Sequence, residues 1–100
     1  MKINITTGTG VGPTELAAFD NALVNAGIAN FNLIYLSSVI PPGSEVIDSP
    51  IPIKPDGNWG DRLYIVIGQK RTSVRNQEAW AGVGWMQDPE TKKGLLVEHE

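Results

Sequence analysis

Along this 100-residue chain, the spacing of apolar side chains changes from every second residue to every third or fourth residue. Residues 2–7 alternate apolar and polar side chains, which predicts a strand. Apolar residues then recur at helical spacing and predict a helix with a core-facing stripe. The stripe residues are Leu16, Phe19, Leu23 and Ala26. Thr14 suits the N-cap of this helix and Gly27 its C-cap.

The rest of the chain predicts mainly strands. Residues 31–36 are rich in β-branched and aromatic side chains, and residues 63–67 are almost all apolar, as in a buried strand. Residues 79–86 and 95–100 predict a hairpin around a turn at 88–94, and residues 41–61 contain most of the prolines and predict a loop. We therefore expect one α+β domain over residues 1–100, with a mainly antiparallel sheet and a packed helix.

The glycine-rich segment 7–12 precedes the predicted helix. It contains neither the lysine of a phosphate-binding loop nor the full dinucleotide-binding fingerprint. We therefore interpret it as a loop in which the glycines adopt positive φ angles.

Composition and charge exclude several classes of function. The net charge is −3 and the basic residues are scattered, which argues against nucleic acid and suits a cationic substrate. Without cysteine and with one histidine, we expect neither a disulfide nor a metal site. No apolar run approaches the roughly 20 residues that span a bilayer. The first residues do not form a signal-peptide core, so we expect no membrane partner and a cytoplasmic location.

Two adjacent serines offer the most specific chemistry. Ser37 and Ser38 follow the strand 31–36, and Pro41-Pro42 comes shortly after them. Attack by the Ser38 hydroxyl on the Ser37 carbonyl would move the acyl group from nitrogen to oxygen. Elimination and hydrolysis would then leave a pyruvoyl group at position 38. Such a step needs a strained, fixed peptide and a donor for the oxyanion. The simpler alternative is a serine pair that only ends a strand.

Three segments in the same order resemble the pyruvoyl-dependent arginine decarboxylase family. They are residues 16–28, residues 32–42 with the serine pair, and residues 94–100. The resemblance implies the family's sandwich fold and self-cleavage into a β chain, 1–37, and an α chain, 38–100. It also implies a covalent pyruvoyl cofactor derived from Ser38 that converts arginine to agmatine and carbon dioxide. The family's enzymes are homotrimers of cleaved protomers with active sites between subunits.

Two carboxylates are candidates for the site. Glu98 follows an apolar run, and the family has a glutamate on this strand that donates a proton, so we expect this role for Glu98. Glu100 falls on the same strand face, which leaves a swap of roles open, whereas His99 points the other way. We expect Asp20 to bind the substrate guanidinium, because a carboxylate meets that planar group bidentately. An ordinary surface aspartate is the alternative.

Three further residues are candidates by family position. Asn32 would stabilise the oxyanion or hold the scissile bond, although it lies five residues before Ser37 on one strand. Leu23 and Phe31 would line the substrate pocket, and core packing explains them equally well. The three tryptophans are expected in the core or at a subunit contact rather than against substrate.

The last residues leave alternatives open. Relatives usually continue beyond the position of Glu98, so we expect either a chain lacking its C-terminal part or a minimal member of the family. The rival functions are a pyruvoyl enzyme for another amino acid and an uncleaved, non-catalytic assembly partner.

Overall fold

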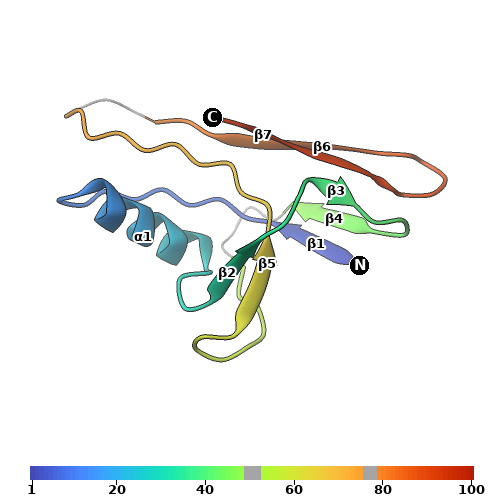
Figure 1. Ribbon diagram of the computed structural model, residues 1–100, viewed down its shortest axis with the longest axis horizontal. Helices are drawn as coiled ribbons and strands as arrows, with labels where there is room; N and C mark the ends of the chain where they lie inside the picture. The colour runs from blue at the N-terminus through green and yellow to red at the C-terminus, as the bar shows by residue number, and fades with distance from the viewer. Residues whose placement is uncertain (49–52, 76–78) are drawn as a thin grey trace.

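The computed structural model describes residues 1–48, 53–75 and 79–100, with overall dimensions of 47 × 31 × 23 Å (Figure 1). These residues form one helix and seven strands. The helix is α1 (Glu15–Ala26), and the strands are β1 (Lys2–Ile5), β2 (Asn32–Tyr35), β3 (Val39–Ile40), β4 (Glu45–Asp48), β5 (Arg62–Ile65), β6 (Gly82–Gln87) and β7 (Gly94–His99).

Helix α1 begins and ends where the sequence predicts. The Thr14 hydroxyl accepts a hydrogen bond from the Ala17 amide at 3.1 Å and so satisfies one of the free amides of the first turn. Gly27 ends the helix in the left-handed region at φ 89°, and its amide donates to the Val24 carbonyl. Both caps are therefore confirmed.

The predicted apolar stripe of α1 is only partly buried. Ala26 is buried, Phe19 and Leu23 are half-buried, and Leu16 is 62% exposed, so its placement in the core was wrong. The reason is that the glycine-rich segment packs against the alanines of the helix rather than against its larger side chains. A Cβ on Gly10 would clash with the carbonyl of Ala18.

The glycine-rich segment is extended and lies along α1. The prediction of positive φ angles at its glycines was wrong, because the positive-φ glycines of the described residues lie elsewhere in the chain. Gly8 and Gly10 instead allow close approach, since a Cβ on either would meet helix backbone. Asn21 Nδ2 donates to the Val11 carbonyl at 2.7 Å, which fastens the segment to the helix.

The strands form three small sheets. Strands β1 and β4 pair in parallel, as do β2 and β5, while β3, β7 and β6 form a three-stranded antiparallel sheet. The mixed helix and strand content is confirmed, but the mainly antiparallel arrangement holds only for the third sheet. The sequence interpretation missed β4, because its short β-branched run lies within a proline-rich stretch read as loop.

The remaining strand predictions have mixed outcomes. The hairpin is confirmed, with β6 and β7 joined by a turn that includes Lys92 at φ 65°. The strand predicted as buried at 63–67 corresponds to β5, but Tyr64 is 57% exposed because β5 has one partner strand only. No helix in the described ranges is long and apolar enough to cross a membrane.

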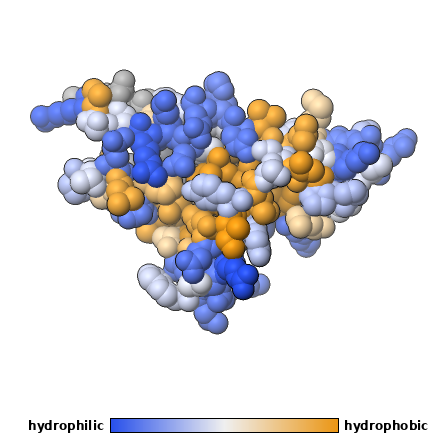
Figure 2. All heavy atoms as spheres, viewed as in Figure 1, coloured by the Kyte–Doolittle hydropathy of each residue, from blue (hydrophilic) through white to orange (hydrophobic). Residues whose placement is uncertain are grey.

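The described core is small. The buried apolar residues are Ala26, Ile28, Ile40 and Leu96. Large apolar side chains lie instead at the surface, and Figure 2 shows them gathered across the middle of the molecule. Trp59 is 85% exposed and Trp80 is 76% exposed, so the core interpretation of these tryptophans was wrong. Such patches mark surfaces that bind other protein.

Candidate functional site

Ser38 lies where the chain leaves β2 and enters β3 (Figure 1). Val39 pairs with Leu95 and Ile40 with Gly94, so β3 is held along the edge of β7. The Ser38 carbonyl accepts a hydrogen bond from the Leu96 amide at 2.7 Å. Backbone bonds on β7 therefore fix the position of Ser38.

The Ser38 hydroxyl contacts Glu98. Ser38 Oγ donates a hydrogen bond to Glu98 Oε1 at 2.6 Å, a short distance typical of a hydroxyl bound to a carboxylate. Glu98 is half-buried and lies on the same face of β7 as the buried Leu96, because residues two apart on a strand share a face. Val97, on the opposite face of the strand, is 61% exposed.

This pair can move a proton. A carboxylate at hydrogen-bond distance accepts the proton of a hydroxyl and so makes its oxygen a stronger nucleophile. The two residues are 60 positions apart in sequence, and pairing of β3 with β7 brings them together. The contact is part-buried, so water screens it less than it screens a surface pair.

Ser37, which is joined to Ser38 by the peptide bond that self-cleavage would break, is exposed. The last hydrogen bond that follows β2 joins the Leu36 amide to the Ile65 carbonyl at 2.8 Å. The Ser37–Ser38 bond therefore lies between two anchored stretches of backbone, one on β5 and one on β7.

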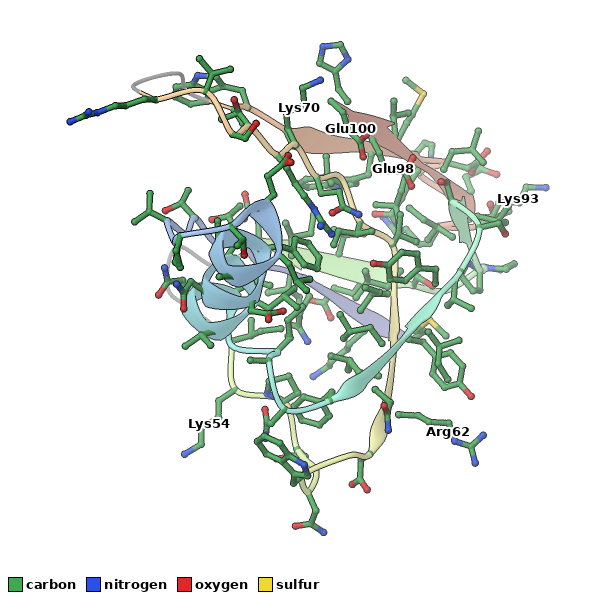
Figure 3. The ribbon with its side chains drawn as sticks, turned by 60° about the vertical axis from the view of Figure 1, so that its left-hand side comes forward. Lys54, Arg62, Lys70, Lys93, Glu98 and Glu100 are labelled. Carbon is green, nitrogen blue, oxygen red and sulfur yellow. The ribbon has the colours of Figure 1, made fainter. Side chains whose placement is uncertain are left out.

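Glu100 and His99 are placed differently from Glu98. Glu100 Oε1 accepts a hydrogen bond from the Gln69 amide at 3.0 Å, while Glu98 faces Ser38. Figure 3 labels both glutamates along β7. His99 is exposed and pairs with Gly82 in the hairpin. Within one chain, Glu98 is thus the carboxylate of this strand that contacts the serine.

Asn32 and Phe31 lie at the far end of β2. Asn32 Nδ2 donates to the Gly60 carbonyl at 2.6 Å, and the Asn32 amide donates to the Asp61 carbonyl. Asn32 begins β2, whereas Ser38 lies three residues after its end at Tyr35. Phe31 is half-buried with its ring against Gly57. One chain does not bring these residues to the serine pair.

Asp20 and Leu23 belong to α1. Asp20 is exposed and Leu23 is half-buried. In Figure 1, α1 lies on the left of the molecule and β3 on the right. Among the described residues, no hydrogen bond or ion pair joins Asp20 to Ser38 or Glu98. The predicted guanidinium anchor and the predicted proton donor are therefore on separate parts of the chain.

Sequence reasoning missed two residues next to Glu98. A Cβ placed on Gly68 would lie 3.6 Å from the Glu98 Cβ, and the Gln69 amide binds Glu100. A glycine directly after a strand was the available signal, but it did not indicate which strand it would meet. The described residues include no group of three or more His, Cys, Asp or Glu side chains that could hold a metal ion.

Comparisons with known proteins agree on one family. The family model for pyruvoyl-dependent arginine decarboxylase matches residues 2–100. A protein of that name from Halobacterium salinarum is 45% identical over 85 residues, which cover 84% of this chain and 51% of the relative. A namesake from Picrophilus torridus is 36% identical, covering 98% of this chain and 54% of the relative. Another from Methanococcus vannielii is also 36% identical, covering 98% and 57%.

The chain spans about half the length of these curated relatives. The match nevertheless extends over almost every residue of the chain, including the serine pair and β7. This chain therefore belongs to the pyruvoyl-dependent arginine decarboxylase family.

Proposed function

We propose that this chain is the precursor of a decarboxylase that converts arginine to agmatine and carbon dioxide. The precursor cuts itself between Ser37 and Ser38 into fragments 1–37 and 38–100, and Ser38 becomes a covalent pyruvoyl group. Family membership supports the proposal, and the observation that supports it most strongly is the 2.6 Å hydrogen bond from Ser38 Oγ to Glu98 Oε1.

The first step is serinolysis. Glu98 accepts the hydroxyl proton as Ser38 Oγ bonds to the Ser37 carbonyl carbon, and the peptide C–N bond breaks to give an ester and a free amine. Loss of the Ser38 α-proton then breaks the Cβ–O bond, so that Ser37 leaves as a carboxylate. Addition of water to the tautomerised residue replaces nitrogen with oxygen and releases ammonia. The Leu96 amide holds the residue-38 carbonyl during these steps.

The residues around position 38 fit the cofactor that the family implies, because it would form in place from Ser38, which β7 already holds. When present, the pyruvoyl group supplies an electron sink that lets an amino acid lose carbon dioxide. Glu98 then delivers a proton to the carbon that carbon dioxide has left. Its position on the buried face of β7 keeps this proton transfer away from bulk water.

Substrate binding requires more than one chain. Asp20 is exposed on α1 and separate from Ser38, so we assign guanidinium binding to Asp20 of a neighbouring subunit in a homotrimer. Leu23 of that subunit lines the aliphatic part of the pocket together with Phe31. Within its own chain, the bond of Asn32 to the Gly60 carbonyl favours a holding role over an oxyanion role. In the assembly, we expect the sheets to complete the family's sandwich.

Intact-mass spectrometry tests this proposal. We expect two masses that correspond to a break between Ser37 and Ser38, with the second fragment lacking a free amine. Borohydride reduction in the presence of arginine should then add one substrate to the 38–100 fragment. A single intact mass after long incubation would contradict the proposal.

The exposed apolar surface favours a second candidate, an uncleaved subunit that acts in assembly only. Trp59 and Trp80 are among the large side chains that a partner would cover. The same mass measurement separates the two functions, since the assembly subunit keeps its Ser37–Ser38 bond. A third candidate acts on another amino acid, such as histidine or aspartate, and faster turnover of one of these than of arginine would favour it. An Asp20→Ala protein with unchanged arginine selectivity would refute the assignment of Asp20 as the guanidinium anchor.

A further inference from the structure

A short segment of the chain crosses the inner face of the β6–β7 hairpin beside Glu98. We call Gly68–Arg71 the crossing segment. It follows β5 and passes between α1 and the hairpin (Figure 1). Figure 3 shows Lys70, which belongs to it, near the labelled glutamates of β7, and the hydrogen bond from Gln69 to Glu100 confirms that the two lie side by side.

Gly68 is the closest point of this approach. A Cβ built on Gly68 would lie 2.9 Å from the Gly82 carbonyl oxygen, nearer than a real Cβ comes to another atom. It would also lie 3.6 Å from Glu98 Cβ and from Val83 Cγ2. Val83 is the residue of β6 that pairs with Glu98. Gly68 therefore lies directly against the strand pair that holds the carboxylate.

The neighbouring residues fasten the crossing segment on both sides. The Gln69 amide donates to Glu100 Oε1 at 3.0 Å, which ties the segment to the end of β7. Arg71 Nε donates to Gln69 Oε1 at 3.3 Å, and the Arg71 guanidinium carbon lies 4.1 Å from the centroid of the Phe19 ring on α1. A guanidinium at this distance from a ring face is attracted by the ring quadrupole.

We propose that Gly68 is a positioning residue for Glu98, which it holds toward Ser38 because the crossing segment can lie on β7 only where a side chain is missing. The inference rests on the proposed function and adds a residue to it. The same segment binds Glu100, the residue after β7, through the Gln69 amide, while Glu98 contacts the serine.

A glycine-to-alanine pair tests the proposal in the full chain. Gly68→Ala forces the segment or β6 to shift, and we expect self-cleavage at Ser37–Ser38 to slow by about 10- to 100-fold, since a displacement near 1 Å has effects of this size. Gly84→Ala is the matched control, because a Cβ there meets nothing within 4 Å. Equal cleavage rates in the two variants would overturn the proposal.

A second readout separates this inference from the proposed function. In the uncut chain, the carboxyl carbon-13 chemical shift of Glu98 reports its hydrogen bond with the Ser38 hydroxyl, which self-cleavage would consume. We expect this shift to move in Gly68→Ala and to stay in Gly84→Ala. If the parent chain is not cleaved, the proposed function fails, and the chemical shift alone then decides the role of Gly68. An unchanged shift would overturn it.

A variant without added volume covers the case in which Gly68→Ala does not fold. Glu100→Ala removes the acceptor of the Gln69 amide, so the crossing segment loses one of its two attachments. We expect slower cleavage, about threefold to tenfold, which corresponds to the net contribution of roughly one typical hydrogen bond. Glu100→Gln keeps an acceptor oxygen and should cleave at the parent rate. Equal rates in both variants would contradict the role of the segment.

Discussion

The three-stranded sheet and the two parallel strand pairs differ in how they relate to the Ser37–Ser38 bond. Strands β3, β7 and β6 all follow this bond in sequence, and their sheet holds both Ser38 and Glu98. In each parallel pair, by contrast, one strand precedes the bond and the other follows it. The nucleophile and its proton acceptor would thus lie in one fragment, and the parallel pairs would join that fragment to 1–37.

The backbone hydrogen bonds on the two sides of the Ser37–Ser38 bond indicate how the fold could tolerate a break there. On the side of residue 38, β7 holds the new end through the Leu96 amide. On the side of residue 37, Ser37 is exposed and the nearest backbone bond is that of Leu36 to Ile65. If the chain is cut as proposed, residue 38 would stay bound directly to β7, whereas Ser37 would be one residue beyond its nearest backbone bond.

The largest effect is expected from Ser38→Ala. Without the hydroxyl there is no nucleophile, so self-cleavage should stop completely and the two fragments should remain one chain. Intact-mass spectrometry measures this result. Ser37→Ala is the control, because it keeps both the nucleophile and the attacked carbonyl, and it should still be cut. Two fragments from Ser38→Ala would contradict the assignment.

Glu98→Gln should have the next largest effect. The amide oxygen can still accept the bond from Ser38, but the side chain no longer accepts or delivers a proton. We expect agmatine formation to fall by about 10²- to 10⁴-fold, the usual contribution of an acid–base group. The paired variant Glu100→Gln should keep near-parent activity. Loss of activity in Glu100→Gln alone would assign the proton to the other carboxylate.

Asp20→Asn probes a residue that belongs to neither type of sheet. Losing a charge-assisted bidentate contact with guanidinium should raise KM for arginine by about 10- to 100-fold, with a smaller change in kcat. Steady-state kinetics on the cleaved protein measures both constants. Glu15→Gln on the same helix is a charge-matched control and should leave KM unchanged. An unaltered KM in Asp20→Asn would remove Asp20 from the pocket.

Leu33→Ala weakens one of the parallel pairs. Leu33 is half-buried and pairs with Leu63 of β5, so its truncation should cost about 1–2 kcal/mol of the association free energy of the two fragments. Urea titration of the cleaved protein, followed by size-exclusion chromatography, measures that loss. Val24→Ala, at a position that is 60% exposed, should change it little. Equal effects would show that β2 and β5 do not join the fragments.

The smallest effect concerns the turn between β6 and β7. The backbone amides of Thr91 and Glu90 donate to Asp88 and hold its pKa below the ordinary value of 3.8. Because the unfolded chain then binds more protons in acid, this stabilisation is present above pH 3.8 and is lost as the pH falls through the lower folded-state pKa. In Asp88→Asn, the free energy of unfolding should therefore decrease slightly less as the pH falls below 3.8, as measured by urea unfolding at several pH values. An unchanged pH dependence would contradict this account.

Local signals in the sequence predicted local structure well. Thr14 and Gly27 define the ends of α1 because capping depends on residues within one turn. The β6–β7 hairpin follows from a turn-rich stretch between two strands for the same reason. The parallel pairing of β1 with β4 was not predictable in this way, because it joins residues more than 40 positions apart.

The candidate site shows the same division. The serine pair is visible in sequence, but its contact with Glu98 spans 60 positions, and only the family resemblance brought the two residues together beforehand. The sequence does not indicate which segment covers the face of β7 that holds Glu98. Gly68 was missed for the same physical reason, since its importance lies in what it touches.

The turn after the double proline has a consequence for the newly made end. Ser44 is 3% exposed, and its hydroxyl donates to the Pro41 carbonyl at 2.7 Å. Gln87 Nε2 bridges the carbonyls of Ser44 and Lys92 at 2.9 Å each. If the chain is cut, the first residues of the new fragment would be held at residue 38 by the Leu96 amide and at Ser44 by these hydrogen bonds. This short segment would therefore have little freedom to move. The first residue of a chain is normally mobile, whereas this pyruvoyl end would be held as firmly as a residue inside a strand.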